Sequence, residues 1–250
     1  FFEEEGLNVT MTQFEDGPTI IAAMENGSVN FGYIGQGAHK LCVQGNATII
    51  ALSHISNGDA LIGGPGISTV EDLKGKVVAY SSGTSSEDIL RNALAAHNMS
   101  LTVLEQVEGA TKLADNMTFS DTTVSLASWI ATPKYLEENR DVTVRFVRAL
   151  MKAMDYAADG NYEEVAQWCA TQAALDYDTM YNQRGDADWL TSKEVYDGVA
   201  DGTVAGYYEL QQELMISSGN LESEVPVEDY VAFDIMTEAG DALYGEAAAE

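Results

Sequence analysis

Cationic residues are scarce in this sequence. It has 12 lysines and arginines against 40 aspartates and glutamates in 250 residues, which gives a formal net charge of −28. Such a surface repels nucleic acids and anionic membranes and favours a soluble monomer, so we expect neither nucleic acid nor membrane as a partner. An anionic ligand remains compatible with this charge only if backbone N–H groups and helix N-termini build its site locally.

Cysteine and histidine are also rare. The two cysteines, Cys42 and Cys169, stand far apart and match no metal or redox spacing. We expect both to be small buried apolar residues, although a disulfide between them stays open. The three histidines are scattered without the spacing of metal ligands. The sequence therefore predicts no metal site and no cofactor.

Long apolar runs are missing. No stretch reaches the roughly 18 apolar residues that a membrane-spanning helix requires, and no signal-peptide pattern is visible. The first residues, 1–5, have the composition of a helix end, and Gly6 is typical of its C-cap. We therefore expect a leading strand and most of a helix to be missing before Phe1.

Short apolar strands alternate with helices through the first half of the chain. Turn residues separate the predicted strands 9–14, 29–33, 48–53, 60–62, 77–80, 103–107 and 124–129. Helical periodicity predicts helices over 19–26, 38–44, 87–97, 141–159, 161–173, 202–217 and 227–243, and Ser68 to Glu71 forms a capping box that opens a short helix. This alternation predicts an α/β fold with mostly parallel sheets and a helical C-terminal part.

The pattern restarts after Gly63, which predicts two sheets and hence two lobes. Lobe 1 is discontinuous and comprises residues 1–62 and 123–250, including the helical C-terminal part. Lobe 2 comprises residues 63–122. No low-complexity linker separates the halves, so we expect the lobes to be joined by crossing strands with a ligand cleft between them.

A set of short motifs resembles a family of solute receptors that bind sulfonates, nitrate, taurine and thiamine precursors. In chain order the motifs are Phe2-(x3)-Gly6-Leu7-x-Val9, Ala23-Met24-x-x-Gly27-x-Val29-x-Phe31-Gly32 with Gly35, Ile67-(x4)-Asp72-Leu73-Lys74-Gly75-Lys76-Val77-x-Ala79, and Gly83-Thr84-Ser85. Each motif is weak alone, but their order and spacing agree over about the first hundred residues. The resemblance implies the type 2 periplasmic-binding-protein fold.

The same resemblance implies a function. It predicts the extracytoplasmic solute-binding protein of an ATP-binding-cassette (ABC) importer, which works with a permease and an ATPase and carries out no chemistry. Its location would be the periplasm or, as a lipid-anchored protein, the cell surface, and the acidity slightly favours the anchored form on a Gram-positive cell. The implied ligand is a small anion such as a sulfonate, taurine or nitrate.

The sequence departs from the family pattern in two places. Asn30 stands where these receptors often have an acidic residue, and lobe 2 is short because no counterpart of the unit around Met24 to Gly32 appears between Glu108 and Asp121. The junction at 100/101 also lacks the polar turn expected between a helix and the next strand. We therefore expect residues of the natural chain to be missing near 100/101 and near 108/111.

Two loops at the carboxyl ends of predicted strands are the best candidates for ligand contacts. Glycines in the first loop allow close approach of backbone N–H groups, and hydroxyl groups cluster in the second. The second cluster exceeds what an N-cap requires. The predicted contacts are Gly35, Gln36 and Gly37 in the first loop and Gly83, Thr84 and Ser85 in the second.

Three further residues are candidates on weaker grounds. Phe14 follows the first predicted strand, next to the acidic pair Glu15 and Asp16. Trp129 ends the returning strand and could stack on a ligand or pack in the core. Arg184 is one of few cations and could clamp an anion in bidentate fashion.

Other functions stay open. Stacking on aromatic side chains would suit a pyrimidine or other thiamine precursor, and a cationic or zwitterionic ligand is compatible with the negative charge. A thiamine-precursor biosynthetic enzyme of the same superfamily is a further alternative, although no nucleophile–base pair stands out by spacing. A ligand-sensing domain with this fold is another.

Overall fold

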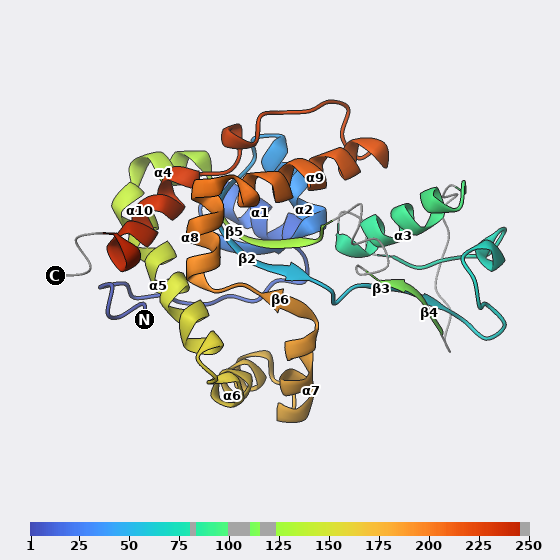
Figure 1. Cartoon of the computed structure of the whole chain (residues 1–250), viewed down its shortest axis with the longest axis horizontal. Helices are drawn as coiled ribbons and strands as arrows, with labels where there is room; N and C mark the ends of the chain where they lie inside the picture. Colours follow the sequence, from blue (N-terminus) through green and yellow to red (C-terminus); the bar gives the residue numbers. More distant parts are fainter. Residues whose placement is uncertain (81–83, 100–110, 116–123, 246–250) are drawn as a thin grey trace.

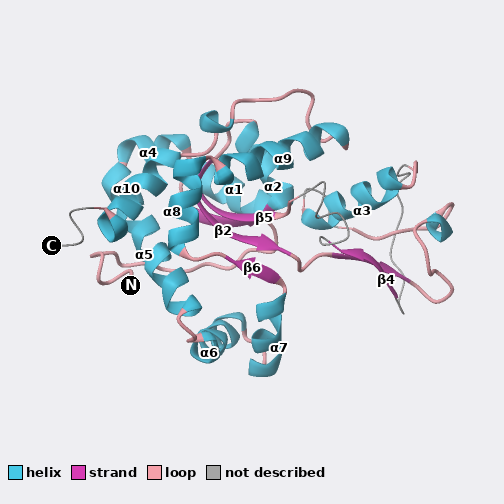
Figure 2. Ribbon diagram, in the orientation of Figure 1, coloured by secondary structure: helices cyan, strands magenta, loops and turns pink. Residues whose placement is uncertain are grey.

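A computed structural model of the chain describes residues 1–80, 84–99, 111–115 and 124–245. The described part is a mixed α/β structure with helices packed around an open sheet, and a smaller group of elements extends from one side (Figures 1 and 2). The predicted α/β class is confirmed. No helix in the described residues is long and apolar enough to cross a bilayer.

The main sheet has four strands in the order β1-β5-β2-β6, and each neighbouring pair is antiparallel. Its strands are β1 (Phe31–Gly35), β2 (Thr48–Ser56), β5 (Leu126–Ala131) and β6 (Ala187–Trp189). The expectation of mostly parallel pairing was wrong for the described strands. Strands β1 and β2 run in the same direction and are connected through helix α2 (Gln36–Val43). Strand β5 comes much later in the chain, lies between them and runs in the opposite direction.

Helices pack on this sheet through apolar faces. The longest is α5 (Arg140–Ala158), whose buried residues Val144, Phe146, Val147, Leu150 and Met151 recur at helical spacing. It packs against α10 (Phe233–Tyr244), which also contacts α8 (Ser192–Asp201) (Figure 1). The remaining helices of this group are α1 (Gly17–Glu25), α4 (Pro133–Glu138), α6 (Tyr162–Ala173), α7 (Tyr177–Asn182), α9 (Thr203–Ser217) and the short 3-10 turns η3 (Gln183–Gly185) and η4 (Val227–Asp229).

A second, two-stranded sheet belongs to a smaller body. Strands β3 (Ala60–Gly63) and β4 (Thr111–Asp115) pair antiparallel, and α3 (Ser85–Ala96) and the 3-10 turn η1 (Glu71–Leu73) lie with them (Figure 1). Their apolar cluster comprises Leu61, Val70, Leu73, Leu90, Ala93 and Leu94. The larger cluster draws only on residues before 56 and after 123. The described side chains thus form two separate cores, here called the larger body and the smaller body.

Several predicted elements take a different form. Residues 9–14 form no strand and are largely exposed, because no described strand lies beside them to accept ladder hydrogen bonds. The predicted strand 77–80 is reduced to a bridge at Val78, and the predicted helix 227–243 is split because Tyr230 and Ala232 bond to Ile49 of β2. The predicted strand 103–107 and the junctions at 100/101 and 108/111 lie outside the described residues.

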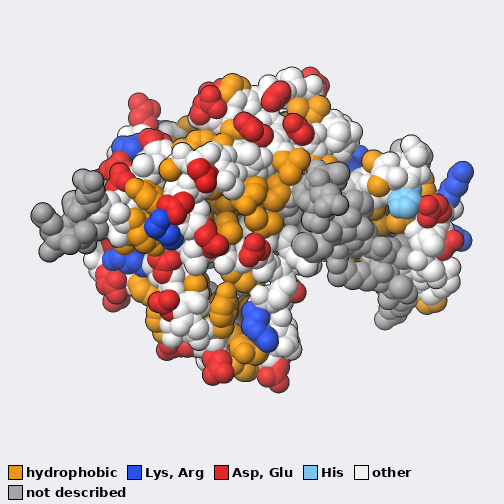
Figure 3. Space-filling model, viewed as in Figure 1, with side chains coloured by type: hydrophobic (Ala, Val, Ile, Leu, Met, Phe, Trp, Pro, Cys, Tyr) orange, Lys and Arg blue, Asp and Glu red, His pale blue; other side chains and the backbone are white. Residues whose placement is uncertain are grey.

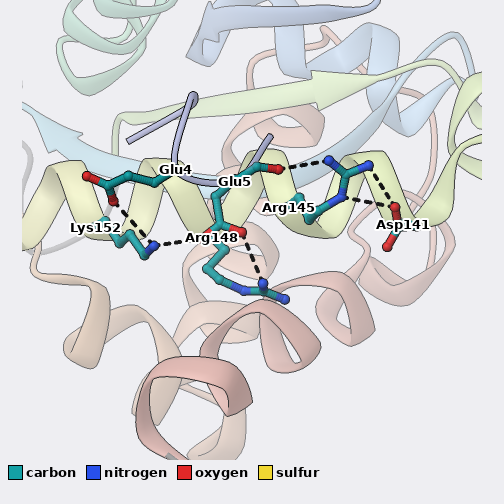
Figure 4. A network of polar contacts seen from close by, with 6 residues as sticks. All are labelled: Glu4, Glu5, Asp141, Arg145, Arg148 and Lys152. Atoms are coloured by element: carbon teal, nitrogen blue, oxygen red, sulfur yellow. Dashed lines mark hydrogen bonds and ion pairs between the residues drawn. The ribbon is translucent and has the colours of Figure 1, made fainter. Parts of the chain in front are cut away.

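The N-terminal residues are fastened to α5. The Glu5 carboxylate, whose side chain is only 7% exposed, lies 3.0 Å from an Arg148 nitrogen and 2.7 Å from the Lys152 ammonium (Figure 4). Arg145 donates to the Glu5 carbonyl at 2.8 Å. Gly6 has a φ of +69°, and the amide of Leu7 bonds to the carbonyl of Phe2, as at the end of a helix. The left-handed turn predicted at Gly6 is confirmed, but residues 1–5 form a turn and not a helix.

The cysteines are not paired with each other. Cys42 is buried, as expected, whereas Cys169 on α6 is exposed, and both are free thiols. A disulfide between them does not form, and the expectation that Cys169 is buried was wrong because it lies on the outer face of α6.

Candidate functional site

The N-termini of α2 and α3 meet at the junction of the two bodies. A methyl group placed on Gly37 would lie only 2.1 Å from the carbonyl carbon of Thr84 and 2.3 Å from its Cα. The predicted loops at 35–37 and 84–85 are therefore in direct backbone contact. Gly83 lies outside the described residues.

Both helices begin without a side-chain cap. Gly35 precedes α2 and Thr84 precedes α3, each in an extended conformation, and neither makes a side-chain capping bond within the described residues. The first N–H groups of a helix have no intrahelical partner and carry a partial positive charge. Two helix N-termini in contact are therefore suited to an anion or a strong hydrogen-bond acceptor.

The hydroxyl groups of the second loop bond within the protein. The Ser85 hydroxyl donates to the Asp59 carboxylate at 2.9 Å, and the Thr84 and Ser86 hydroxyls are 2.9 Å apart. Asp59 lies in the segment that joins β2 to β3, so Ser85 fastens the start of α3 to the connection between the bodies. This contact could not be foreseen, since the residues are 26 positions apart.

Buried polar side chains lie directly behind the junction. Gln36 and Asp88 are only 4% and 6% exposed. The Asp88 carboxylate accepts hydrogen bonds from the Gln36 amide and, at 3.1 Å, from Asn220 Nδ2. Burial raises the pKa of Asp88 to about 6, an effect that the Gln36 hydrogen bond partly opposes.

One turn further along α2, His39 is fully buried. Its Nδ1 lies 2.8 Å from Gln211 Oε1 of α9. Burial lowers the pKa of His39 to about 4, so the imidazole is neutral at pH 7. Sequence reasoning missed His39, Asp88, Gln211 and Asn220, and no local pattern marks them.

An aromatic row crosses one face of the main sheet at the same end as Gly35. Ring centroids are 4.9 Å apart for Tyr33 and Trp129, 6.3 Å for Tyr33 and His54, and 4.4 Å for His54 and Trp189. The Tyr33 hydroxyl lies 3.0 Å from His54 Nδ1, and burial lowers the pKa of His54 to about 4. Tyr33 and Trp189 remain 38% and 41% exposed, so the row offers a surface on which a ring could stack.

Two other predicted contacts lie outside the loops at 35–37 and 84–85. Phe14 is half-buried in the irregular segment before Asp16, whose carboxylate caps α1 by accepting from Thr19. Arg184 lies in η3, where its guanidinium is 3.9 Å from the Tyr181 ring centroid and donates to the Tyr181 carbonyl. Arg184 is thus held on α7. Its backbone carbonyl accepts from the Trp189 indole at 2.9 Å, next to the aromatic row.

A surface groove of about 520 Å³ lies at the opposite end of the main sheet, where Thr48 begins β2. Its cation, Arg140, is already paired with Asp234 at 2.6 Å and Glu238 at 2.8 Å. The groove therefore offers a ligand no free positive group, and we place the candidate site at the α2–α3 junction. Within the part of the chain that the structure describes, no cluster of His, Cys, Asp or Glu has the arrangement of a metal site.

Comparison with protein families assigns the chain to a family. The family model described as NMT1/THI5 like matches residues 1–126, half of the sequence. The chain belongs to the NMT1/THI5-like family. The resemblance found in the motifs is confirmed.

A relative matches nearly the whole chain. The Brucella abortus protein named "Putative binding protein BAB2_1146" is 27% identical over 269 residues, covering 94% of this chain and 84% of the relative. Because that alignment is longer than the chain, the relative has residues with no counterpart here.

The fold is confirmed by structures of low sequence identity. The alkanesulfonate-binding protein SsuA of Xanthomonas axonopodis, bound to MOPS, matches with a TM-score of 0.65 at 15% identity over 92% of this chain and 90% of its own. A Candida albicans protein with the generic periplasmic-binding-protein fold matches with a TM-score of 0.64 at 12% identity, over 92% of this chain and 88% of its own. The chain has the periplasmic-binding-protein fold.

Proposed function

We propose that this protein is the solute-binding component of an ABC importer and that its solute binds at the α2–α3 junction. The observation that supports this best is the backbone contact between Gly37 and Thr84, which joins two uncapped helix N-termini from separately packed bodies. A solute held there touches both bodies at once. Binding can then favour the closed arrangement over an open one.

We propose that the two bodies are the two predicted lobes, with one change to the boundary: β3 (Ala60–Gly63) belongs to the smaller body, because Leu61 packs in the smaller core, so the first boundary lies before Ala60 and not at 62/63. The described segment that links them is residues 57–59, after β2. Closure of the two bodies would carry the solute into contact with both helix N-termini, and the closed form would dock on a permease served by an ATPase. We propose a monomer located outside the cytoplasm, either in the periplasm or as a surface lipoprotein.

The helix N-termini support an oxyanion as the bound head group, such as that of a sulfonate, taurine or nitrate. Each hydrogen bond to a charged group contributes roughly 1.5–3 kcal/mol. Four or five such bonds would support micromolar binding after the costs of association, which correspond to several kcal/mol. No cationic side chain is needed, because the backbone supplies the donors.

The aromatic row supports a second candidate, a flat heterocycle with N–H donors such as a pyrimidine. Tyr33 and Trp189 offer exposed ring faces for stacking, and the carboxylates of Asp59 and Asp88 are acceptors near the junction. This solute class would bind by stacking and by donating to carboxylates. The proposal keeps the importer function and changes only the ligand.

We propose binding without chemistry. The buried histidines, His39 and His54, are hydrogen-bonded to Gln211 and Tyr33, and burial raises the pKa of the Cys42 thiol to about 12. None of these groups is poised as a nucleophile with an adjacent base. A thiamine-precursor enzyme would need such a pair.

A thermal-shift screen followed by calorimetry tests the proposal. The panel is ethanesulfonate, taurine, nitrate, aminopyrimidines and aromatic acids. A solute at a hundred times its dissociation constant adds about 2.7 kcal/mol of stability, which is readily measured. Stabilisation by the anions supports the oxyanion site, and stabilisation by aminopyrimidines alone supports the aromatic row. If folded protein responds to no small solute, the importer proposal fails.

A further inference from the structure

Three segments converge on the Asp88 carboxylate. Asp88 belongs to the first turn of α3 in the smaller body, whereas Gln36 begins α2 and Asn220 follows α9, both in the larger body. The side chain is 6% exposed, and its second oxygen has no partner among the described residues. A single carboxylate thus joins the two bodies next to the contact between Gly37 and Thr84.

Helix α9 and the residues that follow it bond to both helices of the junction, α2 and α3. Through Gln211 it bonds to His39 on α2, and Asn220, which follows its C-terminus, bonds to Asp88 on α3. Gln211 and His39 are 2% and 0% exposed, so this side of the arrangement is part of the core. The Asn220 bond is the peripheral one, because Asn220 itself is half-buried. It can therefore break without unfolding the larger body.

Burying a carboxylate is costly unless donors surround it. The neighbouring acid Glu87 is bonded to Arg91 of the same helix at 2.5 and 2.8 Å. The other charged groups that act on Asp88 are Glu87, Lys40 of α2 and Arg91. Among the described residues, the side chains that donate to Asp88 are two neutral amides, both supplied by the larger body. Separating the bodies removes these donors, which offset the burial of the carboxylate.

We propose that Asp88 is a positioning residue of the solute site, which holds the N-terminus of α3 against that of α2 by accepting hydrogen bonds from Gln36 and Asn220. These hydrogen bonds of Asp88 to Gln36 and Asn220 are here called the bridge. The inference rests on the proposed function, since it assigns the bridge to the closed arrangement of the two lobes. The bridge populates the closed arrangement before any solute binds. It thereby preassembles both helix N-termini for the solute.

The test exchanges donor and acceptor across the bridge. Asn220→Asp places a second carboxylate at the 3.1 Å contact, and the double variant Asp88→Asn with Asn220→Asp restores one donor and one acceptor. The control Asn8→Asp adds the same charge at an exposed position in the larger body. Circular dichroism verifies that each variant is folded.

The readout is the distance between the bodies without solute, measured by electron–electron double resonance. One spin label reacts with the native Cys169, which is exposed, and the other with Lys76→Cys in the smaller body, while Cys42 is too buried to react. The labelled parent protein, with native Asp88 and Asn220, should give predominantly the short distance, which is that of the closed arrangement. Like charges in contact cost several kcal/mol, so Asn220→Asp should lower the ratio of closed to open protein at pH 7.5 by about tenfold or more.

The pH dependence separates this role from a general loss of packing. At pH 5 the paired carboxylates of Asn220→Asp share a proton, and the short distance should return. The double variant should show the short distance at pH 7.5, and Asn8→Asp should match the parent protein. The proposal is overturned if the parent protein is open, or if Asn220→Asp leaves the distance unchanged, or if the double variant fails to restore it. These outcomes need no solute, so they are distinct from a failure of the solute screen.

Discussion

At the scale of single residues, the absence of a side chain at Gly37 determines how closely α2 and α3 approach. The Gly37 Cα faces the Thr84 backbone, which cannot rotate away as a flexible side chain would. At Gly35, two residues earlier, an added methyl group would meet no atom of the described residues within 4 Å. Glycine is thus required by contact at position 37, whereas no described contact requires it at position 35.

Replacing Gly37 with alanine should therefore separate the two helix N-termini. We expect Gly37→Ala to weaken solute binding by about tenfold or more, since a displacement of about 1 Å in a preorganised site has effects of this size or larger. The measurement is calorimetric titration with the most stabilising solute of the panel.

Gly206→Ala serves as the matched control, because Gly206 lies within α9 and faces open space. Alanine in a helix interior is favoured over glycine by about 1 kcal/mol, so this variant should be slightly more stable and bind normally. Unchanged affinity in Gly37→Ala would show that the helix contact plays no part in binding.

Two buried histidines give the fold a pH dependence. His39 and His54 have pKa values lowered to about 4 by burial, from 6.5 for a free side chain. Their neutral forms are required in the folded state, so stability is complete above pH 6.5 and falls as pH decreases towards 4. Asp88 acts in the opposite direction below pH 6, because its pKa is raised. The net loss should be on the order of 3 kcal/mol.

The variant His39→Gln should lose less stability over this interval than the parent protein does. The comparison is the slope of unfolding free energy against pH between 6.5 and 4.5, obtained from urea titrations. A parent protein equally stable at both pH values would contradict the argument.

At the scale of elements, the N-terminal segment depends on α5. Glu5 is paired with Arg148 and Lys152 while nearly buried, whereas Glu4 is 59% exposed and lies 3.5 Å from Lys152 (Figure 4). Two carboxylates adjacent in sequence thus contact the same helix with different burial. Their energetic contributions should differ accordingly.

Glu5→Ala should lower the free energy of unfolding by about 2 kcal/mol, because it leaves Arg148 partly buried without its partner. Glu4→Ala should change stability by no more than about 0.5 kcal/mol, as expected for an exposed ion pair. Urea denaturation of both variants gives the comparison. Equal effects of the two substitutions would show that burial of the Glu5 pair is unimportant.

The elements also show what local sequence can and cannot predict. The helix at 140–158 was predicted within a residue at each end, because its apolar face follows the helical period. The antiparallel insertion of β5 between β1 and β2 was not, since pairing depends on residues far apart in the chain. Likewise, the loops at 35–37 and 84–85 could be identified from glycine and hydroxyl composition. The Asp88–Asn220 contact could not, because its partners are 132 positions apart and Asp88 is one of 40 acids.

At the scale of the whole molecule, acidic side chains are scattered over the visible surface, whereas the candidate site would use backbone dipoles. Acidic side chains are spread over the larger body, and few cations interrupt them (Figure 3). The charge of −28 should limit self-association and keep the protein monomeric. Local donors at two helix N-termini can still hold an anion, because their effect is confined to the first turn of each helix.

A crystal structure of the protein with the most stabilising solute of the panel tests the central claim most directly. We predict that the solute accepts hydrogen bonds from backbone N–H groups at the start of α2 and of α3, in contact with both bodies. A solute bound in the groove beside Arg140, or on one body alone away from this junction, would contradict the assignment of the site.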